Sequence, residues 1–333
     1  MKIIVPMAGM GKRMRPHTLT IPKPLIPVAG KPIVQHLMED IVKVCPEKVD
    51  EIAYVVGRFG KETEQRLVAI AESLGAKGGI HYQDEPLGTA HAILCAEPAL
   101  IGKVVIAFAD TLFRTDANID EKSDGTIWVK QIDDPRQFGV VKVDKNNVIT
   151  DFVEKPQEFV SDLAIIGIYY FKDGENLRSE LQYLIDNNIK DKGEYQLTNA
   201  MENMKNKGKK LVPGKVTEWL DCGNKDATVY TNKRVLEIKY PAGQVHPSAK
   251  IINSVIVHPC LIDKDAVIEN SVIGPHVSLG NGTKTMNAII RNSIIQNNSV
   301  IDSAVIDNSM VGSHVSYKGK WQDLSMGDYS TEN

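Results

Sequence analysis

The sequence has few cysteines, and their spacing matches no zinc-binding or redox pattern. Only four occur in 333 residues, and no two of them form a C-x-x-C pair or lie beside a cluster of histidines. Such a distribution indicates neither a zinc site nor a disulfide framework, and it fits a reducing compartment. The four are Cys45, Cys95, Cys222 and Cys260.

Long apolar runs and a surplus of charge of one sign are missing as well. No run reaches the roughly 18 apolar residues of a membrane-spanning helix, and the first, Ile3–Ala8, is too short for the hydrophobic region of a signal peptide. The 39 basic and 42 acidic side chains leave a net charge of -3, with no block of like charge that would indicate a nucleic-acid arm. We therefore expect a cytoplasmic protein that binds neither membranes nor nucleic acids.

The composition is that of a globular protein. Hydrophobic residues make up 42% of the chain and charged residues 24%, which excludes a disordered chain, a collagen and a coiled coil. At about 100 to 200 residues per domain, the length predicts two domains.

Up to Tyr240, short strands rich in Val and Ile alternate with helical patterns. This alternation is typical of a mostly parallel α/β sheet. The expected strands are Lys2–Met7, Ile52–Val56 and Lys103–Phe108, and the expected helices are Val34–Val44, Glu62–Leu74, Tyr195–Asn206 and Asn224–Lys239. Because Pro241–Gly243 has the composition of a linker, we predict a first domain over residues 1–240 and a second over residues 241–333.

The second domain is rich in Val and Ile and contains a repeated motif. Residues 245–316 hold 22 Val or Ile and no aromatic residue. The motif Asn-Ser-aliphatic-aliphatic begins at Asn253, Asn270, Asn292 and Asn308, at spacings of 17, 22 and 16 residues. This is the hexapeptide pattern of a parallel β-helix with about 18 residues per coil. We expect the longest gap to contain a loop near residues 281–287. A β-sandwich of short strands is the alternative to the β-helix as the fold of this domain.

A β-helix presents flat aliphatic sides and exposed ends, which commonly pack against copies of the chain. We therefore expect a homo-oligomer. Trp321 and Tyr329, in the tail after the repeats, are candidates to cover the last coil.

A loop containing glycines follows the first expected strand. The segment 8–16 reads A-G-M-G-K-R-M-R-P, and its glycines allow backbone N–H groups to approach an anion, of which phosphate is the expected one. Arg13 stands where a Walker loop has Ser or Thr, and the third glycine of the dinucleotide-binding fingerprint is missing. The loop therefore belongs to neither of those two classes.

Five motifs, in order along the chain, make it resemble the sugar-1-phosphate nucleotidylyltransferases. The glycine loop and the following Pro22-Lys23-Pro24 match the family signature G-x-G-x-R-hydrophobic-x-P with P-K-P. Residues 83–92, Q-D-E-P-L-G-T-A-H-A, resemble the base-reading loop of the family, and Glu154-Lys155-Pro156 resembles its sugar-phosphate motif. Residues 193–198 and 219–223 match its later blocks. The chain is similar in particular to the long-form glucose-1-phosphate thymidylyltransferases, which carry a C-terminal β-helix.

The resemblance implies a Rossmann-like nucleotidyltransferase domain followed by a left-handed parallel β-helix of hexapeptide repeats. It also implies a transferase that attaches the nucleotidyl group of a pyrimidine nucleoside triphosphate, dTTP in first place, to a sugar 1-phosphate, glucose 1-phosphate in first place. An NDP-sugar and pyrophosphate are the implied products, and Mg²⁺ is the implied cofactor. The alternatives are a UTP-dependent uridylyltransferase acting on glucose 1-phosphate or N-acetylglucosamine 1-phosphate, a hexapeptide acyltransferase, and a non-catalytic regulatory homologue.

Two anions must meet in such a reaction, because the sugar phosphate attacks the α-phosphorus of the nucleotide while pyrophosphate leaves in line. Cationic side chains are needed to offset their repulsion. Arg13 can hold phosphate oxygens as a fork, and Lys23 can act as a point charge. These two are the candidate catalytic residues.

The resemblance assigns the nucleotide to the glycine loop and to the base-reading loop. Gln83 carries a donor and an acceptor on one planar amide, which suits the O4 and N3–H edge of uracil or thymine better than guanine. The candidate nucleotide-binding residues are Ala8, Gly9, Gly11, Lys12, Gln83, Pro86, Gly88 and Thr89.

Two aspartates follow apolar runs. Asp110 comes after Val104–Ala109 and so lies at the carboxyl end of an expected strand, where open α/β sheets bind ligands. Asp221 follows Trp219 and Leu220 in a similar place. The resemblance makes both aspartates ligands of Mg²⁺, an ion that prefers hard oxygen ligands. It assigns the sugar phosphate to Gly139, Glu154, Lys155 and Gly167.

The chain departs from the family pattern at several positions. Ala109 stands in place of a common Gly, Thr111 in place of Asn, and Lys12 in place of Thr or Ser. The strand that contains Ala164–Gly167 lacks the Asn found in short-form relatives. The identity of the sugar and the choice between dTTP and UTP therefore stay open on the sequence.

Overall fold

A computed structural model describes residues 1–117, 119–320 and 325–331. Its contacts group the chain into two compact units, Met1–Ile26 with Pro32–Gly223 and Pro27–Lys31 with Asn224–Asn333. The second unit thus includes a short segment from the N-terminal part of the chain and the last helix of the expected first domain. The domain limits at residues 240 and 241 remain a prediction.

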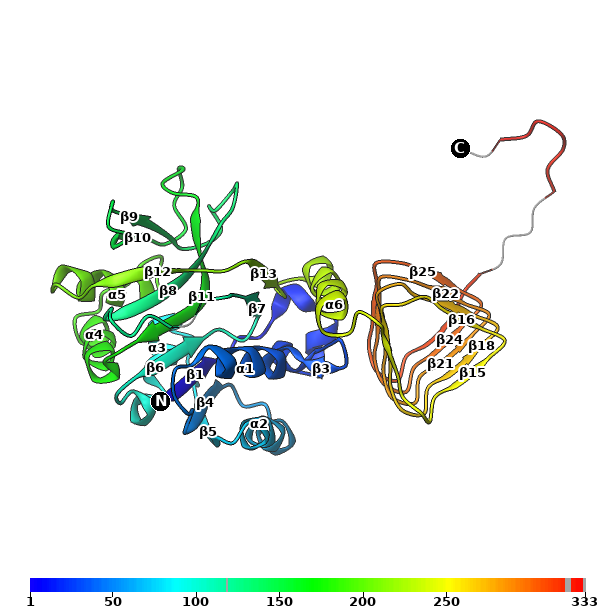
Figure 1. The fold of residues 1–333 in the computed structure, drawn as a ribbon, viewed down its shortest axis with the longest axis horizontal. Coiled ribbons are helices and arrows are strands. Elements are labelled where there is room, and N and C mark those ends of the chain that lie inside the picture. Colours follow the sequence, from blue (N-terminus) through cyan, green and yellow to red (C-terminus); the bar gives the residue numbers. More distant parts are fainter. Residues whose placement is uncertain (118, 321–324, 332–333) are drawn as a thin grey trace. The chain divides into compact units, whose positions relative to one another are not determined.

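Among the described residues, the first unit is built on a nine-stranded sheet with a parallel core (Figure 1). Strands β5, β4, β1 and β6 are parallel neighbours, and β11 joins β6 in the antiparallel direction. Strands β9 and β10 extend the sheet beside β11, while β8 pairs with both β11 and β12. The strands are β1 (Lys2–Pro6), β4 (Glu51–Val56), β5 (Lys77–Tyr82), β6 (Val104–Ala107), β8 (Gly125–Gln131), β9 (Val140–Val143), β10 (Ile149–Val153), β11 (Leu163–Phe171) and β12 (Leu211–Lys215).

Burial explains why the central strands form. Ile3, Ile4 and Val5 of β1 are each 0% exposed, as expected for a central parallel strand that is covered on both faces. A separate antiparallel ribbon consists of β7 (Thr111–Arg114) and β13 (Glu218–Asp221). This ribbon joins segments that lie far apart in the sequence.

Helices pack around the sheet of the first unit. In α4, Leu177, Leu181 and Leu184 return at helical spacing and are fully buried in the core, and the Asp173 side chain caps the helix by accepting a hydrogen bond from the backbone N–H of Asn176. The helices are α1 (Ile33–Val44), α2 (Lys61–Ser73), α3 (Thr89–Leu94), α4 (Gly174–Asp186) and α5 (Leu197–Asn206), with short 3₁₀ turns at Lys12–Met14, His17–Leu19, Lys23–Leu25 and Glu97–Ala99. The expected strands and helices of this region are therefore confirmed.

The second unit contains helix α6 (Lys225–Lys239), the segment Pro27–Lys31 and a parallel β-helix. Three parallel sheets form the faces of the β-helix, and its coils have a triangular outline in Figure 1. The sheets are β14-β17-β20-β23-β26, β15-β18-β21-β24-β27 and β16-β19-β22-β25. The predicted left-handed parallel β-helix is confirmed.

The coils have nearly constant length. Gln244 pairs with Leu261, 17 residues later, and Val300 pairs with Ser316, 16 residues later. The strands are β14 (Gln244–Val245), β15 (Lys250–Ile252), β16 (Val255–Ile256), β17 (Cys260–Ile262), β18 (Val267–Glu269), β19 (Val272–Ile273), β20 (Val277–Leu279), β21 (Lys284–Met286), β22 (Ile289–Ile290), β23 (Ile294–Ile295), β24 (Val300–Asp302), β25 (Val305–Ile306), β26 (Met310–Val311) and β27 (Ser316–Lys318). A short β2-β3 pair (Pro27–Val28 with Lys31–Pro32) completes the set in the described residues.

The Asn-Ser motif has a structural reason. Asn253 and Asn270 adopt left-handed φ angles of 46° and 48° at a corner of the coil, a conformation that Asn tolerates better than most residues. The next residue links the coils, because Ser254 Oγ accepts a hydrogen bond of 3.0 Å from the backbone N–H of Ser271. The motif therefore marks a corner and ties it to the following coil.

The prediction of a loop near residues 281–287 is wrong. Strand β21 (Lys284–Met286) lies there, and Asn287, with φ 50°, takes the corner position of Asn270 one coil later. Asn292, with φ 43°, lies at the next corner of the same coil. The 22-residue gap between Asn270 and Asn292 therefore separates two different corners and contains no insertion.

A stack of aliphatic side chains fills the β-helix. Its members point inward from the three faces; they are Ile262, Ile268, Ile273, Leu279, Ile290, Ile295 and Ile301, with Ile306 and Val311 packed against them. Tyr329 is fully exposed in the tail, while Trp321 lies outside the described residues. None of the helices in the described part of the chain has both the length and the apolar character needed to cross a bilayer.

Candidate active site

Two adjoining cavities lie at the carboxyl ends of β1 and β6, within the first unit. The first has a volume of about 450 Å³ and the second about 280 Å³. Arg13, Thr89, Phe108 and Asp110 line both cavities. This is the edge at which open α/β sheets bind ligands, because the chain leaves each parallel strand there in loops.

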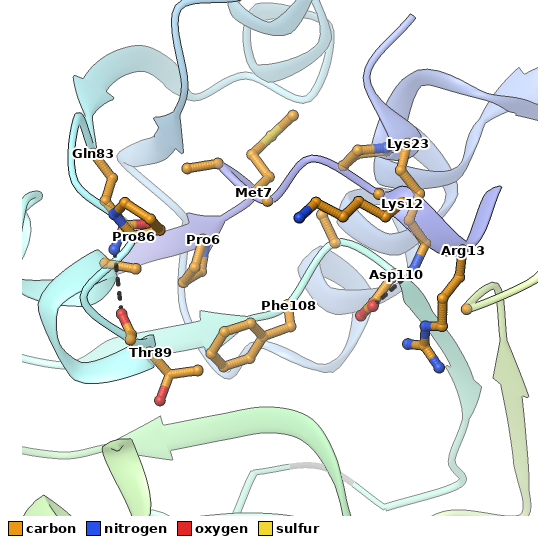
Figure 2. A pocket seen from close by; sticks show the side chains of 18 of the residues that line it. Pro6, Met7, Lys12, Arg13, Lys23, Gln83, Pro86, Thr89, Phe108 and Asp110 are labelled. Atoms are coloured by element: carbon orange, nitrogen blue, oxygen red, sulfur yellow. Dashed lines mark hydrogen bonds and ion pairs between the residues drawn. The ribbon is translucent and has the colours of Figure 1, made fainter. Parts of the chain in front are cut away.

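The first cavity brings together every residue that the sequence assigned to the nucleotide. They come from the loop after β1 and from the loop before α3, and they are Ala8, Gly9, Gly11, Lys12, Gln83, Pro86, Gly88 and Thr89. In Figure 2 the Lys12 side chain points toward the cavity, and Gln83 lies beside Pro86 at the opposite end. Basic and neutral polar groups are therefore separated within one cavity.

Gly11 is required by the shape of the loop. Its φ of 58° lies in the left-handed region, and a Cβ at this position would approach Lys23 Cβ and Thr18 Cγ2 to 3.0 Å. Its carbonyl accepts a 2.9 Å hydrogen bond from the Thr18 hydroxyl. The absence of a side chain thus lets the glycine loop pack directly against the segment that carries Lys23.

Lys23 lies almost buried beside Asp110. Its ammonium nitrogen is 2.8 Å from Asp110 Oδ2, and only 9% of the side chain is exposed, against 42% for Asp110 (Figure 2). Arg13 is exposed and directs its guanidinium to the same region. The two candidate catalytic cations therefore lie where the two cavities share residues.

The two predicted metal ligands lie close together, although 111 positions separate them in the chain. The backbone N–H of Cys222 donates a 2.9 Å hydrogen bond to the Asp110 carbonyl, and Asp221 pairs with Thr111 across the β7-β13 ribbon. Burial raises the pKa of the Asp221 carboxyl, and the nearby Asp110 charge adds to that rise. A hydrogen bond from the backbone of Gly223 and the positive charges of Lys23 and Arg13 oppose it.

The donor set at this place suits a hard divalent cation. Asp110 and Asp221 offer carboxylate oxygens at the junction of the cavities, and Asp221 is half-buried, so a cation could compensate for the water that its carboxylate lacks. In the described part of the chain, no group of three or more His, Cys, Asp and Glu side chains is arranged to hold a metal alone. Two carboxylates supplemented by substrate phosphates and water match the preference of Mg²⁺, whereas a dedicated cage would suit Ca²⁺ or Zn²⁺.

The second cavity brings together the four residues assigned to the sugar phosphate, Gly139, Glu154, Lys155 and Gly167. Glu154 Oε2 accepts a 3.4 Å hydrogen bond from the Thr198 hydroxyl, and its Oε1 lies 3.6 Å from the Lys155 ammonium. Glu154 is 15% exposed and Lys155 54%. The partly buried Glu154 carboxylate can accept hydrogen bonds from hydroxyl groups, while the exposed Lys155 ammonium can reach an anion.

Several residues of the second cavity were not given a role from the sequence. Trp219 packs edge-on against Phe138 with 4.9 Å between ring centroids. Tyr169 also lines the cavity, and burial raises the pKa of its hydroxyl, which therefore stays protonated. Thr198 and Trp219 lie in blocks that match the family, so motif position could have identified them. Tyr169 lies inside a strand pattern. An aromatic residue there is explained by burial in the core, so the sequence gives no signal that it lines a cavity.

Thr89 contributes to the framework of the site as well as to its lining. Its hydroxyl donates a 3.0 Å hydrogen bond to Gln196 Oε1 and accepts a 2.9 Å hydrogen bond from the backbone N–H of Leu197. It thereby connects the start of α3 with the start of α5.

Known proteins resemble the chain over most of its length. Glucose-1-phosphate thymidylyltransferase of Streptomyces antibioticus is 28% identical over 330 residues, which cover 90% of this chain and 88% of that protein. The bifunctional protein GlmU of Methanococcus maripaludis is 30% identical over 266 residues, which cover 77% of this chain and 60% of that protein. The chain thus spans about three fifths of the GlmU length.

Solved structures and a family model agree with these relatives. The structure of UDP-glucose pyrophosphorylase complexed with UDP-glucose aligns with a TM-score of 0.58 at 22% identity, covering 71% of this chain and 98% of that one, which shows a shared fold. The model of the family described as nucleotidyl transferase matches residues 2–238. The chain therefore belongs to the nucleotidyl transferase family, as a sugar-phosphate nucleotidyltransferase.

Proposed function

We propose that the protein transfers a nucleotidyl group from a pyrimidine nucleoside triphosphate, dTTP in first place, to a sugar 1-phosphate, glucose 1-phosphate in first place. The products are an NDP-sugar and pyrophosphate. The observation that carries the proposal is the junction of the two cavities, where Arg13, Lys23 and Asp110 converge. A triphosphate in the first cavity and a sugar phosphate in the second would meet there.

The cations at the junction offset the repulsion between the two anions. Arg13 lines both cavities and its fork can hold oxygens of either phosphate. Lys23 is nearly buried, so its charge is screened less than that of a surface lysine. At an effective dielectric constant of about 20, one charge at about 4 Å contributes roughly 4 kcal/mol, which corresponds to about three decades of rate.

Asp110 and Asp221 would hold the divalent cation, for which we propose Mg²⁺. Bound there, the ion would neutralise charge on the phosphate oxygens as the bond to pyrophosphate breaks. Asp110 also contacts Lys23 at 2.8 Å, so it orients that ammonium toward the same junction. The aspartate therefore has two tasks, and its loss affects both.

The second cavity supports a neutral sugar ring bearing a phosphate. Glu154, hydrogen-bonded to Thr198, can accept from sugar hydroxyls, and Lys155 can approach the phosphate. The Trp219 and Phe138 rings supply an apolar wall. Glucose 1-phosphate is the first choice by similarity to the thymidylyltransferase of Streptomyces antibioticus.

A cytoplasmic location is part of the same proposal. All four cysteines, the full complement of the sequence, are free thiols in the structure. Free thiols are the rule in a reducing compartment.

The test is pyrophosphate release from glucose 1-phosphate with Mg²⁺ and, separately, dTTP, UTP, GTP, ATP and CTP. We expect turnover with dTTP. An Asp110→Asn variant should lose about three decades of kcat, because it removes one full charge from the proposed metal site, an interaction of roughly 4 kcal/mol at an effective dielectric constant of about 20. Asp186→Asn is the matched control, because Asp186 is exposed on α4 and lines neither cavity. Turnover that prefers UTP would favour the uridylyltransferase alternative. Activity that survives Asp110→Asn would contradict the proposed mechanism.

A further inference from the structure

The side-chain amide of Gln83 is held by one group of its own loop and one of helix α3. Its nitrogen Nε2 donates a 3.2 Å hydrogen bond to the Gly88 carbonyl and lies 3.1 Å from His91 Nδ1. A carbonyl oxygen can only accept, so the contact with Gly88 identifies the amide atom on that side as nitrogen. Figure 2 shows Gln83 at the end of the first cavity, beside Pro86.

His91 can satisfy this arrangement in one neutral form. It lies in α3 (Thr89–Leu94), and its second ring nitrogen Nε2 is 3.9 Å from Cys95 Sγ. With the proton on Nε2, the ring donates toward the sulfur, and Nδ1 is left to accept from Gln83. Both amide hydrogens of Gln83 are then used, one by Gly88 and one by His91.

The atom of Gln83 that remains for a ligand is the carbonyl oxygen Oε1. An acceptor at this place pairs with the N3–H group of uracil or thymine, whereas N3 of cytosine carries a lone pair and would be repelled. A rotated amide would present N–H groups to the base and would suit cytosine. The orientation of one amide thus decides which pyrimidine fits, and the earlier expectation that Gln83 supplies both a donor and an acceptor is narrowed to the acceptor.

We propose that His91 is a positioning residue for base selection, which keeps Gln83 Oε1 directed at the base and so favours uracil or thymine over cytosine. The inference rests on the proposed function, because it needs a pyrimidine nucleotide in the first cavity. His91 does not line that cavity and acts through Gln83. If Gly88 were the sole acceptor, the second amide hydrogen of Gln83 would have no partner. His91 Nδ1 is the acceptor for that hydrogen.

The test compares kcat/KM for dTTP with kcat/KM for CTP, both with glucose 1-phosphate. Loss of one hydrogen bond in His91→Leu should lower the ratio of dTTP to CTP about five- to tenfold. His91→Asn can place an oxygen near the position of Nδ1 and should restore the ratio. His17→Leu, which removes a half-buried histidine outside both cavities in the 3₁₀ turn His17–Leu19, is the control and should leave the ratio unchanged.

A merely structural role predicts a different pattern. If His91→Leu lowers turnover of dTTP and CTP equally, the inference is overturned. Coupling to Gln83 gives a second check, because His91→Leu should not change the ratio in a Gln83→Met background. An equal change in both backgrounds would also overturn it.

Binding separates failure of this inference from failure of the proposed function. If the wild-type protein turns over no nucleotide, the proposed function fails, and dissociation constants of UDP and CDP measured by calorimetry replace the kinetic ratio. Tighter binding of UDP that is weakened in His91→Leu supports the role of His91. Equal binding of the two nucleotides, or no binding of either, overturns it.

Discussion

At the scale of single residues, two glycines of the glycine loop after β1 have opposite requirements. A Cβ at Gly11 would meet Lys23 and Thr18 at 3.0 Å, and φ is 58°, whereas a Cβ at Gly9 has no neighbour within 4 Å. We expect Gly11→Ala to lower the free energy of unfolding by about 1–3 kcal/mol, and Gly9→Ala to change it by less than about 0.5 kcal/mol. Urea denaturation of both variants measures the difference. Equal effects would show that the left-handed conformation is not needed.

A second prediction at this scale concerns Asp221, whose carboxyl has a pKa raised by burial. Between the ordinary pKa of an aspartate and this raised value, the folded state binds more protons than the unfolded state. The free energy of unfolding therefore falls as pH rises through that window, and it stays lower above it. Replacement by Asn removes the cost of the buried charge.

With metal removed by EDTA, we expect Asp221→Asn to be more stable than wild type at pH values above the raised pKa of Asp221. The variant should also lack the fall in the free energy of unfolding that titration of Asp221 causes in wild type. Urea denaturation from about pH 4 to pH 8 measures this. Asp186→Asn is again the control, because its carboxylate is exposed. A parallel decline of Asp221→Asn and wild type through the window would count against the assignment. With Mg²⁺ added, wild type should regain stability and Asp221→Asn should regain less.

At the scale of elements, local sequence predicts the parallel core but not the pairings that complete the site. Strands β1, β4 and β6 are evident because each is a short run of Val and Ile. The β7-β13 ribbon pairs Thr111 with Asp221, and no local pattern shows that these segments meet. Both aspartates could be named from motifs, whereas their proximity depends on tertiary pairing.

The same limit explains why the prediction of a loop in the β-helix is wrong. The Asn-Ser motif does not mark one repeated position, because it moves from one corner of the coil to the next between Asn270 and Asn292. Asn287 holds the missing corner and is followed by Ala288 in place of Ser. Because Ala288 replaces Ser at that corner, the coil that contains Asn287 lacks the Asn-Ser motif.

An element-scale prediction concerns Asn232 of α6, which ties three parts of the second unit together. Its side chain is fully buried, and its Oδ1 accepts hydrogen bonds from the backbone N–H of Ala29 at 2.8 Å and from the Ser278 hydroxyl at 2.7 Å. Its Nδ2 donates to the His276 carbonyl at 3.3 Å. This network links Pro27–Lys31 to α6 and to the β-helix within the second unit.

Asn232→Ala leaves buried donors without an acceptor, so we expect it to lower the free energy of unfolding by about 2–4 kcal/mol. Ser278→Ala removes only one partner of the same oxygen and should cost about 1 kcal/mol. Chemical denaturation followed by circular dichroism compares the two. Equal losses would show that the contact with Ala29 contributes nothing to stability.

At the scale of the whole molecule, the second unit carries an exposed aliphatic ladder on one face. Val255, Val272, Ile289 and Val305 are successive partners in the sheet β16-β19-β22-β25 and are 57%, 37%, 48% and 79% exposed. A stripe of this kind is a common site of protein association. A flat, regular face can pack against the same face of a second copy, which makes the interface self-complementary. A second copy of this chain is therefore the partner that we expect.

We therefore predict a homo-oligomer whose assembly depends on this face. Val305→Lys introduces a charge into the ladder and should shift the mass in solution toward the monomer, as measured by light scattering after gel filtration. Ile252→Lys is the matched control, because Ile252 is 48% exposed but belongs to β15 in another sheet. A monomeric wild type contradicts the prediction of an oligomer. An oligomer that Ile252→Lys dissociates while Val305→Lys leaves it intact places the interface on the face formed by the sheet β15-β18-β21-β24-β27.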